Sequence, residues 1–115
     1  MKLPSLQEEI KEILRDLVHS FLKPALLYYA QRYGHRLSEA AARGISVLDL
    51  VRHHNPQLLA VLDQVRRFRN YIDWNTEEYT QMLCNFLREN GVSIGPLEEA
   101  WIRRQVEEVR RVIYS

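Results

Sequence analysis

Apolar residues along this chain recur at intervals of three and four, and no stretch alternates convincingly between apolar and polar residues. The first rhythm places apolar side chains on one face of an α-helix, whereas alternation would indicate a β-strand. Helical segments are predicted at residues 5–22, 25–33, 38–43, 46–51, 55–72, 76–90 and 96–114. The sequence therefore predicts an all-α fold, a single compact bundle of about five to six helices that occupies residues 1–115.

Caps and helix breakers mark the boundaries of these segments. Ser5 and Glu8 form a capping-box pattern, and Asn55-Pro56 places an N-cap before a first-turn proline. The four glycines (34, 44, 91 and 95) all fall at predicted helix boundaries. Pro24 interrupts the first long apolar run, and we expect its ring to end or kink the helix there because proline lacks the amide hydrogen and clashes with the preceding turn.

Size and composition are those of an ordinary globular domain. The length of 115 residues suits one domain, and 46% hydrophobic with 27% charged residues argues against disorder. No apolar run approaches the ~20 residues that span a bilayer, and the first residues do not form a secretory signal. We therefore expect a cytoplasmic protein without a membrane role. Cys84 is the only cysteine, which excludes an intrachain disulfide.

Positive charge is concentrated in the middle of the chain. Residues 31–69 hold seven arginines against three acidic residues, a balance of +4, although the whole chain carries only +1. Residues 70–115 hold five arginines against eight acidic residues, a balance of −3. We therefore expect the middle third of the chain to contact any anionic partner.

The densest group of basic and aromatic residues is residues 66–74, with three of each kind. Guanidinium groups bind phosphates and carboxylates, and aromatic rings stack on nucleic-acid bases. On a helix, Arg66 and Arg67 would point to solvent, either as an ordinary solvated surface or as a contact for a polyanion. Tyr71 and Trp74 could stack on bases or pack inside the protein.

The remaining side chains of this group are expected to be internal. Helical spacing directs Phe68 and Ile72 into the core. Arg69 falls inside the same apolar stripe, where an unpaired charge would be costly. An ion pair with Asp73, four residues later, is therefore favoured over contact with a ligand.

The last predicted helix alternates basic and acidic residues. Arg103 and Arg104 precede Glu107 and Glu108 by four residues. We therefore expect ion pairs along the helix and little net electrostatic field around it. Its apolar residues have the four-three-four spacing of a coiled coil over two heptads: Ile102, Val106, Val109 and Ile113. This seam predicts packing either within the chain or against a partner.

Residues 38–55 resemble a helix-turn-helix in the order of small, glycine, apolar and capping residues. The positions that would read DNA bases are Val47, Leu48, Asp49 and Val51, which cannot supply the required hydrogen-bond donors. A tight turn between two helices of the bundle is the favoured interpretation.

No signature of catalysis is found, so we expect a protein that is not an enzyme. The chain has no phosphate-binding glycine loop and no nucleophile elbow, and Cys84 has no histidine near it in the sequence. Arg69-Asn70 begins the motif of helical HEPN-type ribonucleases, but no histidine follows it.

Two acid–histidine pairs have a spacing that could share a helix face. They are Asp16 with His19 and Asp49 with His53. Neither belongs to the Glu-x-x-His motif of di-iron bundles, and chance accounts for the spacing. No metal and no cofactor are therefore predicted.

In size, all-helical character, lack of catalytic residues and arginines at a helix end, the whole chain resembles the small α-helical subunits of CRISPR interference complexes, which act in antiviral defence. The resemblance implies a bundle that assembles with other protein subunits and holds RNA or DNA by its backbone, without sequence readout. It implies that Arg36, Arg43, Arg52, Arg66 and Arg67 lie on the nucleic-acid side, with Tyr71 or Trp74 as stacking partners. Such contacts would be sensitive to salt.

The alternative is a protein-interaction bundle, homodimeric or adaptor, with no nucleic-acid role. Leu26-Leu27-Tyr28-Tyr29 is apolar nearly all round, and the last helix carries the seam described above. Tyrosine and tryptophan are favoured in interface cores, and the chain has six and two of them. We therefore also expect that the chain can associate with a second copy of itself.

Overall fold

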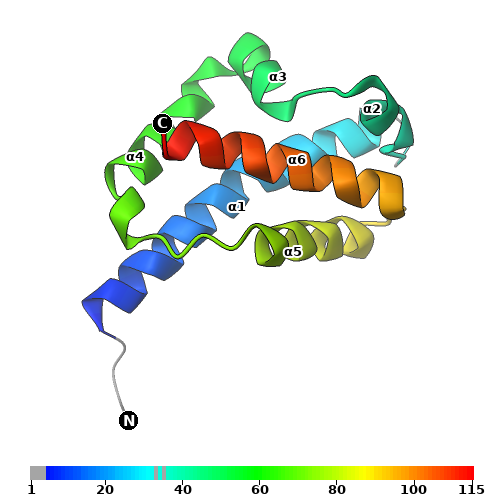
Figure 1. Ribbon diagram of the computed structural model, residues 1–115. Coiled ribbons are helices and arrows are strands. Elements are labelled where there is room, and N and C mark those ends of the chain that lie inside the picture. Colours follow the sequence, from blue (N-terminus) through cyan, green and yellow to red (C-terminus); the bar gives the residue numbers. More distant parts are fainter. Residues whose placement is uncertain (1–4, 33, 35) are drawn as a thin grey trace.

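The computed structural model describes residues 5–32, 34 and 36–115, and these residues form six α-helices and two short 3₁₀ helices (Figure 1). The elements are α1 (Leu6–Arg32), α2 (Ser38–Arg43), α3 (Val47–His54), η1 (Pro56–Leu58), α4 (Leu59–Arg67), η2 (Arg69–Tyr71), α5 (Thr76–Glu89) and α6 (Pro96–Ile113). Within this part of the chain the only strand-like pairing is one isolated bridge between Arg36 and Ser93. The predicted all-α bundle is confirmed.

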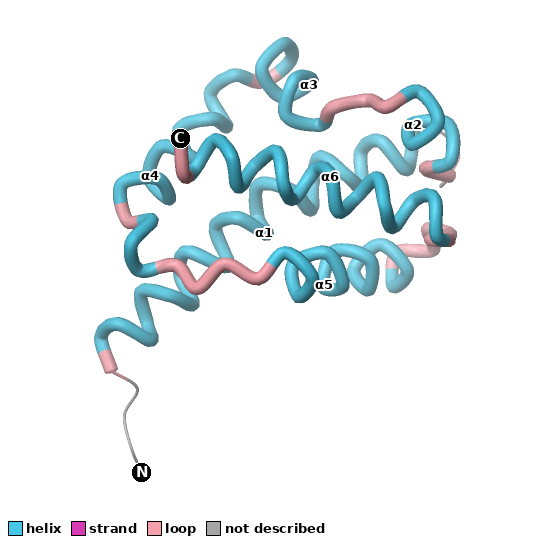
Figure 2. The backbone as a smooth tube through the Cα atoms, viewed as in Figure 1, coloured by secondary structure: helices cyan, strands magenta, loops and turns pink. Residues whose placement is uncertain are grey.

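The first helix is longer than the sequence predicted. α1 runs unbroken for 27 residues through Pro24, so of the two predicted effects of the proline, an end or a kink, the end does not occur (Figure 2). Leu22 and Leu26, on either side of the proline, are both buried in the core. Packing of these turns offsets the backbone hydrogen bond that the proline removes.

The apolar run after Pro24 is buried on one face only. Leu26, Tyr29 and Ala30 are in the core, whereas Tyr28 is 58% exposed. The predicted end of this run, Tyr33, lies outside the described residues.

Local signals correctly located the turn between α2 and α3. Gly44 has φ 63°, a left-handed conformation that favours glycine, and ends α2. Ser46 caps α3, because its Oγ accepts a hydrogen bond from the amide of Asp49 at 3.2 Å. Asn75 caps α5 in the same way, with its Oδ1 accepting from the amide of Glu78 at 3.0 Å.

The predicted helix over residues 55–72 is divided into three elements. η1 leads into α4, which ends at Arg67, and η2 then turns the chain toward α5 (Figure 2). Because the regular spacing stops at Arg67, Phe68 leaves the apolar stripe and is 46% exposed. The prediction of Phe68 as a core residue is wrong, while Ile72 is half-buried against the core.

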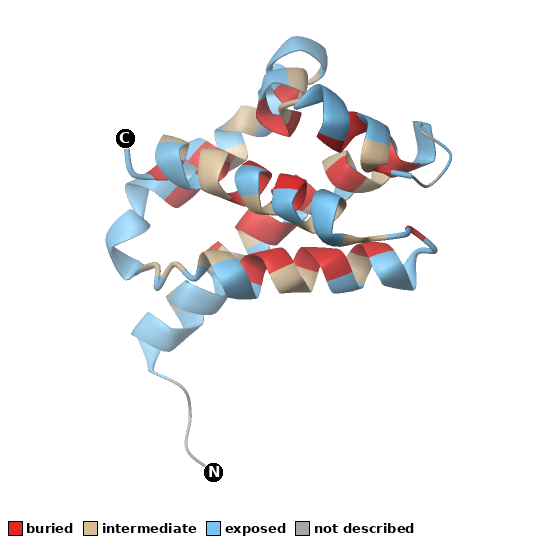
Figure 3. Ribbon diagram, turned by 45° about the vertical axis from the view of Figure 1, so that its right-hand side comes forward, coloured by how far each residue is buried: buried red, intermediate tan, exposed pale blue. Residues whose placement is uncertain are grey.

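α6 lies at the centre of the bundle, in contact with α2, α3, α4 and α5 (Figure 1). Its inner face buries Trp101, Ile102, Val106, Val109 and Ile113, and buried residues of the surrounding helices face it (Figure 3). α1 passes behind α6 and contacts α3, α4 and α5. The seam of the last helix therefore packs within the chain.

Candidate nucleic-acid interface

Three arginines meet where α4 ends and η2 begins. Arg66 and Arg67 occupy the last turn of α4, and Arg69 opens η2. Because the helix ends between them, their side chains spread around a surface hollow of about 280 Å³, which Asp63 also lines. All three arginines are exposed, so guanidinium donors face solvent around one acidic neighbour.

Arg66 and Arg69 are held in place by hydrogen bonds to backbone carbonyls. Arg66 Nη2 donates to the carbonyl oxygen of Ser115 at 2.8 Å, and Arg69 Nη1 donates to that of Arg66 at 2.9 Å. Arg69 forms no ion pair with Asp73, so that prediction is wrong, because the 3₁₀ turn places the two residues off a common helix face. Arg67 has neither a hydrogen bond nor an ion pair with any other described residue.

The last turn of α6 extends this basic end of the bundle. The Arg110 guanidinium lies 5.9 Å from the centre of the Tyr114 ring, and Arg110 Nη1 is 3.7 Å from Glu107 Oε2. The Tyr114 hydroxyl is 3.5 Å from the carbonyl oxygen of Arg69. Sequence reasoning missed the joining of Arg69 and Arg110, since the 40 residues between them gave no signal that α4 and α6 end side by side.

The other predicted arginines lie elsewhere. Arg43 pairs with Glu39 at 2.7 Å within α2, and Arg52 pairs with Asp49 at 3.0 Å within α3. Arg36 is exposed in the segment before α2. α2 and the end of α4 are at opposite ends of the bundle (Figure 1). Of the five predicted arginines, the structure brings together only Arg66 and Arg67.

The two predicted stacking residues have different surroundings. Trp74 is half-buried; its indole Nε1 donates to Thr76 Oγ1 at 2.9 Å, and its ring packs edge-on against Tyr79 with 4.8 Å between centroids. A second edge-on contact joins Trp74 to Tyr114 at 6.2 Å. Tyr71 is exposed on η2, beside the arginine group. Tyr71 is therefore the more accessible of the two rings.

The segment that resembles a helix-turn-helix, residues 38–55, packs against the rest of the bundle. Val47, Leu48 and Val51 are buried, so these positions cannot reach a DNA groove. The Val47 amide donates to Gln105 Oε1 at 2.8 Å, which fixes α3 on α6. The favoured interpretation, a tight turn between bundle helices, agrees with this geometry.

Polar side chains of α6 bond both to other helices and along α6, where Arg103 pairs with Glu99 at 3.8 Å and Arg110 with Glu107 at 3.7 Å. Arg103 forms two hydrogen bonds to the Glu77 carboxylate on α5, at 3.0 and 2.8 Å, and these bonds hold the pKa of Glu77 below its usual value. Glu107 accepts from the Thr76 hydroxyl, and Glu108 accepts from Ser46 Oγ at 2.6 Å. The predicted pairs Arg103–Glu107 and Arg104–Glu108 do not form.

Two groups with potential chemistry are buried. Burial lowers the pKa of His19 to about 4, with the charges of Lys23 and Arg15 acting in the same direction. Burial likewise raises the pKa of the Cys84 thiol, and that side chain is 0% exposed. A neutral imidazole and a protonated thiol inside the core serve packing. Among the described residues no group of three or more histidine, cysteine or acidic side chains is arranged to hold a metal ion.

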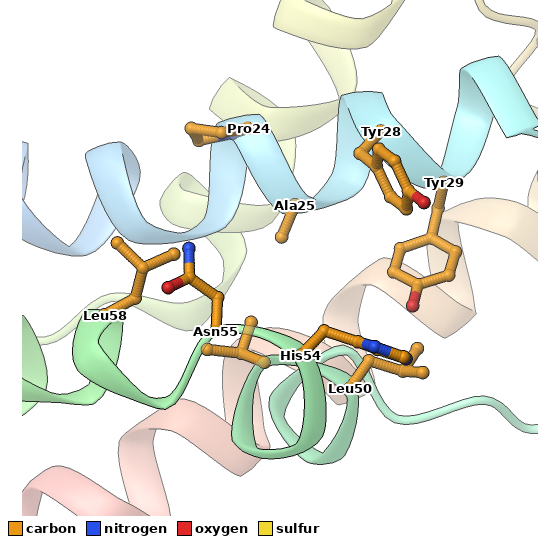
Figure 4. Close-up of a pocket in the computed structure, with 9 residues that line it drawn as sticks. Pro24, Ala25, Tyr28, Tyr29, Leu50, His54, Asn55 and Leu58 are labelled. Carbon is orange, nitrogen blue, oxygen red and sulfur yellow. The ribbon is translucent and has the colours of Figure 1, made fainter.

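Sequence reasoning also missed an apolar face along α1, formed by two hollows. The α1/α3 hollow, of about 350 Å³, is lined by residues that include Ala25, Tyr28, Leu50 and Leu58 (Figure 4). The α1/α4 hollow, of about 320 Å³, is lined by Ile10, Ile13, Leu14, Leu17, Gln64 and Phe68. The unexpected exposure of Phe68 creates the second hollow.

No helix in the described ranges combines the length and apolar character needed to cross a membrane. Comparisons of the chain with protein-family models, with curated proteins and with solved structures find no match.

Proposed function

We propose that this chain is a non-catalytic helical subunit of a nucleoprotein assembly, and that it contacts nucleic-acid backbone through the end of the bundle where α4 and α6 finish. The observation that carries the proposal is the meeting of Arg66, Arg67 and Arg69 around one hollow, with Arg110 joined to them through Tyr114. Among the residues that the structure describes, Asp63 is the only acidic one that lines this hollow. The local excess of positive charge suits a phosphate chain better than a neutral ligand.

The held arginines keep donors for a ligand. A guanidinium has five N–H donors, and the bonds to Ser115 and to the Arg66 carbonyl each occupy one nitrogen. A side chain already fixed in its bound position loses less entropy when a phosphate arrives. Arg67, which has no such bond to a described residue, supplies a further positive charge beside them.

Contact with the backbone, and not with base edges, fits the chemistry of this surface. Its ligand-facing groups are guanidinium forks plus the exposed ring of Tyr71, which stacks on any base. Arg43 and Arg52 are left out of the surface because each is paired within its own helix, and Arg36 because it lies far from α4. An assembly of the kind formed by CRISPR interference complexes, with other protein subunits beside this one, is part of the proposal.

The test is fluorescence anisotropy with short labelled single-stranded RNA, single-stranded DNA and duplex, at about 50 mM and about 200 mM salt. The Arg67→Ala/Arg69→Ala variant should bind more weakly at low salt and lower the slope of log affinity against log salt by about 2. Arg104→Ala is the matched control, since Arg104 is exposed on α6 without an ion pair to a described residue. Absence of binding at low salt, or equal losses in both variants, would refute the assignment.

A further inference from the structure

The first half of α1 carries an apolar stripe on its outer side. Leu6, Ile10, Ile13 and Leu17 are spaced four, three and four residues apart, the pattern of a two-heptad coiled-coil seam. A helix on the surface of a bundle ordinarily presents polar residues to solvent. Leu6 is instead 72% exposed and Ile13 57% exposed, whereas Ile10 and Leu17 pack partly against the core. Half of the seam therefore lacks a partner in the monomer.

The stripe borders a groove of a kind that accepts a helix. Gln64 of α4 and Phe68, the residue after that helix ends, line the α1/α4 hollow together with Ile13, and among the described residues Gln64 is the only polar one in the lining. Ridges of side chains on one helix pack into such grooves between two others. The stripe from Leu6 to Leu17 spans about 18 Å at the usual helical rise of about 1.5 Å per residue.

The apolar surface continues along α1 beyond this groove. Tyr28 and Leu58 line the α1/α3 hollow on the second half of the same helix (Figure 4). Four of the eight large apolar side chains that are exposed in the described residues line one of the two hollows: Ile13, Tyr28, Leu58 and Phe68. Exposed apolar residues gathered on one face indicate an interaction surface.

We propose that this face binds a second copy of the same chain, with α1 of each protomer lying in the α1/α4 hollow of the other. The chain itself supplies both parts that the interface needs, a helix with a two-heptad seam and a groove with an apolar floor. A two-fold axis makes each part meet its complement on the partner, so the contact closes at a dimer. The apolar face lies beside the proposed nucleic-acid contact, and Arg67 borders both surfaces.

Charge along the edges of the groove favours a second copy as the occupant. By helical spacing, Glu9 and Asp16 border the stripe on the outer side of α1, and Arg67 follows Gln64 on the outer side of α4, with Asp63 one turn before it. In the arrangement in which α1 lies along the partner's α4, Glu9 of one protomer meets Arg67 of the other. Such complementarity at an interface rim sets register and disfavours wrong partners.

The test is the oligomeric state of the full chain, measured without nucleic acid by light scattering and sedimentation from about 5 to about 200 µM, a range that reports micromolar dissociation constants. The wild type should be a dimer at the upper end. Ile13→Glu should weaken the dimer by at least about tenfold, because it buries an unpaired charge. Leu97→Glu is the matched control: Leu97 is 50% exposed, lines neither hollow, and its replacement should leave the dimer intact.

A charge exchange separates a second copy from another occupant. Glu9→Arg and Arg67→Glu should each weaken the dimer, and the two together should restore it. Far-UV circular dichroism checks that every variant keeps its helices. The proposal would be overturned by a wild type that stays monomeric, by a dimer that persists with Ile13→Glu, or by a double variant that does not regain the dimer. If the protein is monomeric and this face binds an added amphipathic helix, the groove belongs to another protein.

Discussion

At the scale of single residues, the interior of this protein depends on groups that burial keeps neutral. His19 is 3% exposed, and neither of its ring nitrogens has a hydrogen-bond partner among the described residues. Its ring packs edge-on against Tyr79, with 5.1 Å between centroids. Burial also raises the pKa of Tyr79 to about 12, so both rings are uncharged at neutral pH.

The depressed pKa of His19 makes stability depend on pH in a predictable direction. Between about pH 6.5 and pH 4 the unfolded chain binds a proton at His19 that the folded chain does not bind, so the free energy of unfolding should fall as the pH falls. A shift from 6.5 to about 4 corresponds to a loss of up to roughly 3 kcal/mol. Urea unfolding at pH 7 and pH 4.5 measures the loss, and His19→Phe should make it smaller. Equal losses in both proteins would contradict the assignment to His19.

At the scale of elements, one buried side chain joins α3 to α6. Gln105 Oε1 accepts a hydrogen bond from the Val47 amide at 2.8 Å, and Gln105 Nε2 donates one to the carbonyl oxygen of Trp101 at 3.1 Å. The indole of Trp101 in turn donates to the carbonyl oxygen of Ile45 at 2.7 Å. Of the orphan amides in the first turn of α3, that of Val47 is therefore satisfied by α6, and that of Asp49 by the Ser46 cap.

Replacement of Gln105 by leucine should lower the free energy of unfolding by about 1–3 kcal/mol, because the Val47 amide stays buried without an acceptor. Chemical denaturation followed by circular dichroism provides the measurement. Arg104→Leu, one position away on the exposed side of α6, is the control and should change stability little. A variant of Gln105 as stable as the wild type would show that the amide finds another acceptor.

At the scale of the whole molecule, α6 connects the other elements into one cooperative unit. It contacts α2, α3, α4 and α5, and buried residues from all six α-helices belong to the same core. Loss of any of these four helices would expose part of the inner face of α6, and loss of α1 would expose the buried faces of α3, α4 and α5. Small domains built in this way unfold in a single step.

We therefore expect one unfolding transition. Far-UV circular dichroism reports all helices, whereas tryptophan fluorescence reports the buried Trp101 and the half-buried Trp74. The two signals should share a denaturant midpoint. Two separated midpoints would show that α5 and α6 unfold apart from the rest.

Features set by neighbouring residues could be predicted from the sequence. The all-α class and the boundaries at Gly44, Ser46 and Asn75 follow from helical periodicity, from a left-handed glycine and from side-chain caps. In the candidate site, the exposure of Arg66 and Arg67 follows from the same periodicity up to the end of α4. Each of these depends on contacts within about one helical turn.

Tertiary packing alone decided the rest. Burial of Leu22 and Leu26 stabilises α1 across Pro24. The turn toward α5 ends α4 at Arg67, so Phe68 is exposed and Arg69 does not pair with Asp73. The meeting of Arg69 with Arg110, and the turning of the α6 seam inward, depend on which helices lie side by side. These outcomes come from contacts between residues far apart in the chain, whose energies exceed local preferences and leave no periodic trace in the sequence.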